Sequence, residues 1–133
     1  MLNSKVFISL LLLLSLKSFA LKEGDLKQGI CRAGIFKNPN TFIVEQDVKA
    51  LGKDACKELK SKAEAICRAG IYSNFNFSFS KEVDRIFVIS VCSQIQTEAE
   101  AICLAGYYSN HFAKIKGIQK WVIAAEESCS DLR

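Results

Sequence analysis

The sequence predicts an all-α protein built from three αα-hairpins of about 36 residues, six helices in all, which disulfide bonds hold together. A segment with two cysteines returns every 36 residues. Helix-start signals return with the same period, and apolar residues follow them at helical spacing. A hydrophobic amino terminus indicates export to an oxidising compartment, where disulfides are the expected state of cysteines.

The first residues have the pattern of a secretory signal peptide over 1–20. Lys5 precedes an apolar run over 6–16, and Ser18 and Ala20 supply small residues before a cleavage site. This run is shorter than the roughly 20 residues that a membrane-spanning helix needs, and no later segment is long and apolar enough. We therefore expect a soluble mature protein without a membrane span, secreted or periplasmic.

Cleavage after Ala20 leaves 113 of the 133 residues, the size of a single small domain over 21–133. Lys5 and Lys17 leave with the signal peptide, so 16 basic side chains then balance 14 acidic ones. Because this small excess is interspersed along the chain, nucleic acid is not an expected partner.

The mature chain repeats itself over about 25–60, 61–96 and 97–133. The strings GICRAGIFKNPN, AICRAGIYSNFN and AICLAGYYSNHF begin at positions 29, 65 and 101. Two cysteines per copy keep the same period, apart from one extra residue in the third copy: Cys31, Cys56, Cys67, Cys92, Cys103 and Cys129.

Each copy opens with a signal for the start of its first helix. Ser61 and Thr97 are each followed three residues later by glutamate, which is the capping-box pattern, and Asp25 holds the equivalent position ahead of Gln28. We expect the three helices to begin there, each cap being worth about 1 kcal/mol. The helices should end in turns rich in asparagine and serine, and Pro39 prevents continuation in the first copy.

Each first helix also carries an alanine–glycine pair: Ala33-Gly34, Ala69-Gly70 and Ala105-Gly106. Glycine inside a helix costs up to about 1 kcal/mol relative to alanine. Its return in all three copies therefore indicates either a close helix–helix approach or a local bend.

The second helix of each copy is predicted from stripes of apolar residues, such as Val48, Leu51 and Ala55 in the first copy. In the second copy, residues 83–95 are apolar almost all round, so we expect a helix buried on every side in the middle of the stack. The segments TFIVEQ (41–46) and NFNFSFS (74–80) alternate like strands. Short extended segments before the second helices are therefore a further expectation.

Two families of disulfide pairing agree with the repeat. Pairing within each copy joins its first helix to its second, and it is favoured because it leaves no cysteine unpaired. Pairing across the turns between copies, Cys56–Cys67 and Cys92–Cys103, is favoured by local geometry but leaves Cys31 and Cys129 at the two ends. We expect the first family, with about 3 kcal/mol from each bond. No C-x2-C spacing occurs, so neither a metal site nor a redox dithiol is expected.

The two-cysteine helical hairpin, the 36-residue period and the alanine–glycine step resemble secreted cysteine-rich Sel1-like repeat proteins, and more broadly tetratricopeptide-type arrays. The turns KNPN, SNFN and SNHF stand where Sel1-like repeats carry a glycine-rich turn. The resemblance implies an exported, disulfide-stapled binding scaffold, and it transfers no functional residue.

No motif in the chain specifies a reaction, so we assign no catalytic residue and no cofactor. His111 is the one histidine and lies in a turn, while the glutamates at 64, 98 and 100 are explained by helix starts. Phe75, Phe77 and Phe79 form the candidate binding patch if they are exposed; the alternative is that they close the core. The expected function is a protein-interaction or structural module, and the alternative is a small exported enzyme with a site between helices.

Overall fold

The computed structural model describes residues 24–42, 48–77, 81–110 and 119–133, and none of these residues lies in a strand. The all-helical class predicted from the sequence is therefore confirmed. The described elements are an N-terminal helix over 24–37, η1 (Pro39–Phe42), α2 (Val48–Ala55), α3 (Lys62–Ser73), α4 (Glu82–Cys92), α5 (Glu98–Ser109), α6 (Gln119–Cys129) and η2 (Ser130–Leu132). The predicted signal peptide lies outside the described residues, and no described helix is long and apolar enough to cross a membrane.

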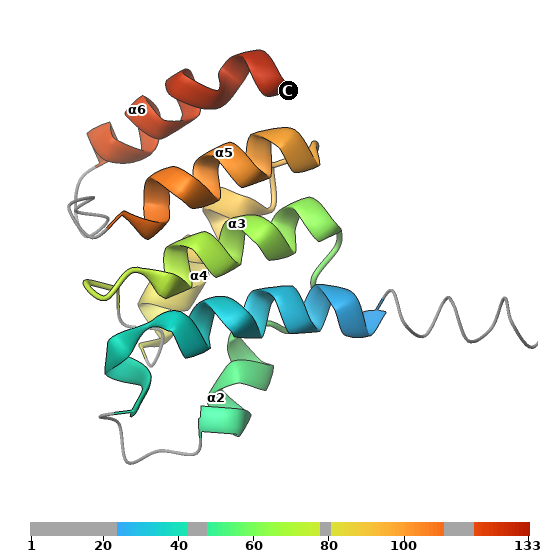
Figure 1. The fold of residues 1–133 in the computed structure, drawn as a ribbon, viewed down its shortest axis with the longest axis vertical. Coiled ribbons are helices and arrows are strands. Elements are labelled where there is room, and N and C mark those ends of the chain that lie inside the picture. The colour runs from blue at the N-terminus through green and yellow to red at the C-terminus, as the bar shows by residue number, and fades with distance from the viewer. Residues whose placement is uncertain (1–23, 43–47, 78–80, 111–118) are drawn as a thin grey trace, which may run out of the picture.

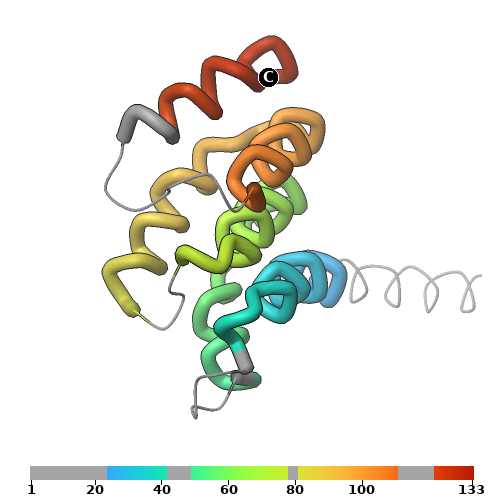
Figure 2. The backbone as a smooth tube through the Cα atoms, turned by 60° about the vertical axis from the view of Figure 1, so that its left-hand side comes forward, coloured from blue at the N-terminus to red at the C-terminus, as the bar shows by residue number. Residues whose placement is uncertain are grey.

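The N-terminal helix, α3 and α5 lie one above another and form a row, which we call the helix row (Figure 1). Figure 2 shows α2 and α4 on one side of this row and α6 beyond α5 at its end. In agreement with both views, α3 packs along α5, α4 packs against α3, and α6 packs against α5. The arrangement is consistent with three stacked helical hairpins.

The alanine–glycine pairs allow the helices of the row to approach closely. A Cβ atom on Gly34 would lie 2.2 Å from the carbonyl oxygen of Ala69, and one on Gly70 would lie 2.4 Å from the Cα atom of Ala105. Contacts under 3.0 Å essentially never occur for a real Cβ atom, so only glycine permits this approach. Of the two explanations that the sequence offered, close approach is the correct one for Gly34 and Gly70, whereas a Cβ on Gly106 would meet no described atom within 4 Å.

Two of the three predicted helix starts are confirmed. The side chains of Ser61 and Thr97 accept hydrogen bonds from the backbone N–H groups of Glu64 and Glu100, at 3.1 and 3.2 Å. Both cap residues have the extended backbone that a cap requires. The prediction for Asp25 is wrong, because the backbone is already helical at residues 24 and 25 and Asp25 lies inside the helix.

The expectation that the second helix of the middle copy is buried all round is also wrong. In α4 only Val88 and Cys92 are buried, whereas Val83 is 70% and Ile86 59% exposed. The reason is that α4 lies beside the helix row and packs against α3 (Figure 2), so one side of it faces solvent.

The expected extended segments are not found where the structure describes them. Thr41 belongs to the short helix η1, and residues 74–77 form a turn. Residues 43–47 and 78–80 of those segments lie outside the described part. The turn is closed by a hydrogen bond from the Phe77 N–H to the Asn74 carbonyl, which competes with strand pairing.

Candidate functional site

Three disulfide bonds join the helix row to the second helices, with both cysteines of each bond in the same copy. Their Cα–Cα distances are 5.9, 5.6 and 5.9 Å, within the usual range. The pairs are Cys31–Cys56, Cys67–Cys92 and Cys103–Cys129. No cysteine is free, so none is available as a nucleophile or a metal ligand.

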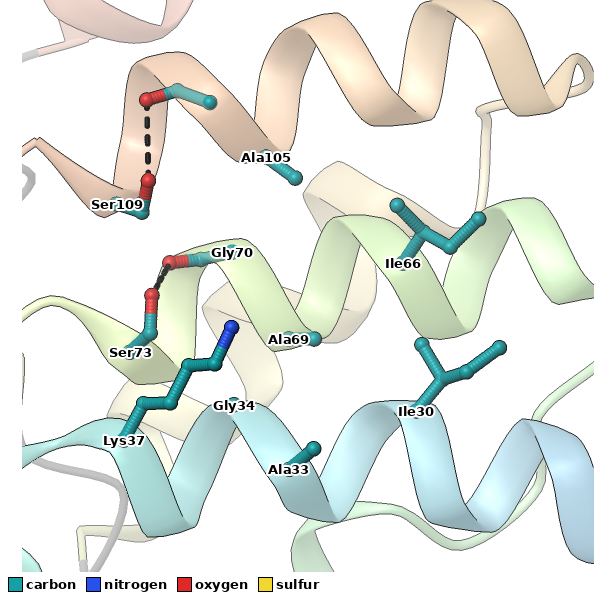
Figure 3. Close-up of a pocket in the computed structure, with 11 residues that line it drawn as sticks. Ile30, Ala33, Gly34, Lys37, Ile66, Ala69, Gly70, Ser73, Ala105 and Ser109 are labelled. Carbon is teal, nitrogen blue, oxygen red and sulfur yellow. Dashed lines mark hydrogen bonds between the residues drawn. The ribbon is translucent and has the colours of Figure 1, made fainter.

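A groove of about 400 Å³ crosses all three helices of the row (Figure 3). Its floor is made of the three alanine–glycine pairs, and its walls include Ile30, Ile66, Lys37, Ser73 and Ser109. The small floor residues leave the helix backbones close to the surface. The sequence identified these pairs as packing residues only. They also form the floor of a groove because one side of the helix row stays uncovered, which the sequence does not show.

The polar groups of the groove lie at one end of it. The hydroxyls of Ser73 and Ser109 donate to the carbonyls of Gly70 and Gly106, at 2.8 and 3.1 Å. Figure 3 shows the Lys37 side chain reaching from the N-terminal helix toward Gly70. The groove is thus apolar over most of its length, with a positive charge near its end.

Buried asparagines link each copy to the next at the ends of the row helices. The Nδ2 atom of Asn38 donates to the carbonyls of Tyr72, Asn74 and Phe77, at 3.0, 2.9 and 3.2 Å. Thirty-six residues on, Asn74 repeats the device and donates to the carbonyls of Tyr108 and Asn110. The repeated asparagines were assigned to turns from the sequence, whereas their side chains also satisfy the last carbonyls of the following helix.

A buried ion pair lies in the middle copy. Arg68 donates to the carboxylate of Glu64 one turn away, and both side chains are almost fully buried. Arg68 also donates to the carbonyls of Ala55 and Lys57 at the end of α2, at 3.2 and 3.0 Å. Glu64 accepts from the backbone N–H of Lys60 in addition. These hydrogen bonds give the pair a structural role, because they fasten the first copy to the second.

Two equivalent tyrosines differ in their hydrogen bonding. The hydroxyl of Tyr72 donates to the Ala55 carbonyl at 3.0 Å, whereas the buried hydroxyl of Tyr108 has no partner among the described residues. Burial raises the pKa of Tyr72 to about 12, and the nearby Arg68 charge opposes this shift. Burial likewise raises the pKa of Tyr108. Neither phenol is poised to exchange a proton near neutral pH.

The candidate aromatic patch does not form one surface. Phe77 is 3% exposed and packs on Tyr72, with ring centroids 5.8 Å apart, so it belongs to the core. Phe75 is 44% exposed, and Phe79 lies outside the described residues. His111, which an enzymatic hypothesis would use, also lies outside them. Glu64 and Glu100 are held by arginines, Glu100 by Arg133 at 2.9 Å.

Within the described ranges, no three His, Cys, Asp or Glu side chains gather to hold a metal ion. The fold and these contacts define a disulfide-stapled helical protein whose helix row carries a groove of small residues. No family model, curated protein or solved structure matches the chain. The resemblance to Sel1-like repeats therefore rests on period, cysteine spacing and the alanine–glycine step.

Proposed function

We propose that this chain is an exported interaction module that holds a segment of a partner protein in the groove across its helix row. The groove itself is the observation that carries the proposal. Its size is that of a small binding site, and its floor of alanine and glycine carries no long side chain that would fill it. Export rests on the signal-peptide pattern of residues 1–20 and agrees with the three disulfides.

The lining indicates the chemistry of the partner segment. Ile30 and Ile66 offer apolar contacts, so the segment should present small apolar side chains toward the floor. Lys37 at one end favours an acidic residue or a terminal carboxylate at the matching end of the segment. A structural role without a specific ligand is the weaker proposal, because it does not account for the groove. No described feature favours the enzymatic alternative.

A binding experiment with matched variants tests the proposal. The oxidised mature protein is used to select peptides from a displayed library and to capture proteins from its own compartment. Ser73→Arg fills the groove from a half-buried position, whereas Val83→Arg adds the same side chain on the exposed side of α4. We expect Ser73→Arg to weaken binding at least about tenfold and Val83→Arg to leave it unchanged.

Two results would contradict the proposal. One is a failure of wild type to enrich any peptide or protein over Ser73→Arg. The other is an equal loss with Val83→Arg, which would place binding outside the groove. Circular dichroism and intact disulfides establish that each variant is folded.

A further inference from the structure

The last helix of the row exposes a face that the earlier helices bury. Ala99, Ile102 and Gly106 of α5, with its C-cap residue Asn110, are exposed at helical spacing, and Ile102 is 60% exposed. We call these four residues the α5 end face. The residues 36 positions earlier in α3 are buried or half-buried, because α5 packs along them.

The first helix of the row exposes the opposite face. Leu26, Gly29, Ala33 and Phe36 are exposed at helical spacing, with Leu26 at 50% and Phe36 at 48%. We call these four residues the N-terminal end face. In α3, the equivalents of Gly29, Ala33 and Phe36 are buried or half-buried, whereas Lys62, the equivalent of Leu26, is exposed.

These two faces are the two halves of a contact that the protein already makes twice. Within the chain, Gly34 receives Ala69 of the next helix, and Gly70 receives Ala105. One further step along the row would bring Gly106 of one molecule against Ala33 of another. Although α6 also packs against α5, this position is open, since no described atom lies within 4 Å of a Cβ built on Gly106.

The side chains at the outer ends suit this step. Ile102 is the equivalent of Ile66, which is half-buried and packs against the core. Phe36 is the equivalent of Tyr72, whose hydroxyl donates to a carbonyl of the preceding copy. Because phenylalanine has no hydroxyl, Phe36 tolerates both exposure in a single molecule and burial in a contact, without an unsatisfied donor.

We propose that a second copy of this chain docks head to tail, its N-terminal end face against the α5 end face of the first. The occupant is identified by continuity, because the new contact extends the internal packing of the helix row. A head-to-tail contact joins two different faces, so it leaves one of each free and extends to longer stacks. The proposal concerns the end faces of the row. Ala33 and Gly106 also line the groove, but the contact between two copies requires no peptide to be bound there.

The test uses two single-end variants of the oxidised mature protein. Ile102→Arg blocks the α5 end face and Phe36→Arg blocks the N-terminal end face, both at positions about half exposed or more. Sedimentation analysis from micromolar to millimolar concentration should show wild type growing in average mass. Each variant alone should remain monomeric, and an equal mixture of the two should form a one-to-one dimer through the two intact faces.

Val83→Arg is the matched control, since Val83 is an exposed apolar residue of α4 away from both end faces. It should associate as wild type does. A wild-type protein that stays monomeric throughout would overturn the proposal. Association of either single-end variant by itself would also overturn it, because it would indicate that a face pairs with the same face of another copy. A mixture of the two variants that remains monomeric would overturn it as well. Binding of peptides in the groove is measured separately and bears only on the proposed function.

Discussion

The same substitution, glycine to alanine, should have opposite effects at equivalent positions of the helix row. Alanine is the better helix former by up to about 1 kcal/mol. At Gly106 the new methyl group meets no described atom, so Gly106→Ala should stabilise the protein by about 0.5–1 kcal/mol. At Gly34 and Gly70 the methyl group would meet the backbone of the next helix at 2.2 and 2.4 Å.

The cost at the two inner positions follows from these distances. Ordinary contact begins near 3.4 Å, and a helix backbone cannot turn aside as a flexible side chain can. The helices would have to separate by roughly 1 Å, and overpacking of this kind costs about 1–3 kcal/mol or more. After the gain in helix propensity, we expect Gly34→Ala and Gly70→Ala each to destabilise the protein by about 2 kcal/mol.

Urea unfolding of the oxidised protein, followed by circular dichroism, measures all three free energies under the same conditions. Gly106→Ala serves as the internal control for helix propensity. Equal stabilisation by all three substitutions would refute the close packing of the row. A larger loss at Gly106 than at Gly34 would refute the assignment of Gly106 to an open end.

Three other predictions concern the buried polar contacts. Tyr72→Phe should cost about 1 kcal/mol in urea unfolding, because it removes the hydrogen bond to the Ala55 carbonyl, whereas Tyr108→Phe should cost nothing. Because burial raises the pKa of Tyr72 from 10.0 to about 12, its contribution to stability is complete below pH 10 and is lost as pH rises toward 12; Tyr72→Phe should flatten that decline. Asn38→Ala should lower the melting temperature, since it removes the buried Nδ2 hydrogen bonds to the carbonyls of Tyr72, Asn74 and Phe77, at a cost of about 1–3 kcal/mol, and the Asn74 carbonyl keeps only its bond from the Phe77 N–H; an unchanged melting temperature would contradict this role.

Much of the fold could be predicted because it depends on residues that are close together in the sequence. The caps at Ser61 and Thr97 act within one helical turn, and the structure has both. The disulfide partners were narrowed to two families by the period, and the glycines pointed to close packing. Because the sequence repeats, each of these local signals occurs more than once, and the recurrence supports each prediction.

The errors came from features that depend on neighbours in space. The apolar sequence of α4 suggested a fully buried helix, yet Val83 and Ile86 face solvent because α4 lies beside the row. The alternating sequence predicts the same environment for Phe75 and Phe77. In the structure, the turn that begins at Asn74 leaves Phe75 exposed and places Phe77 in the core. Alternation alone does not distinguish a strand from a turn that buries one of two aromatic residues.

The candidate site could be predicted least well. The groove is formed by residues that the sequence already explained as packing, and it exists because one side of the helix row remains uncovered. The buried link from Arg68 to the end of α2 joins residues 11 and 13 positions apart across a turn. Only the three-dimensional arrangement brings such groups together.

Non-reducing peptide mapping of the purified protein tests the central claim, that each copy is a pair of helices joined by its own disulfide. We expect three cross-linked peptides, joining Cys31 to Cys56, Cys67 to Cys92, and Cys103 to Cys129. Recovery of a peptide that joins Cys56 to Cys67, or of free thiols in the folded protein, would contradict it.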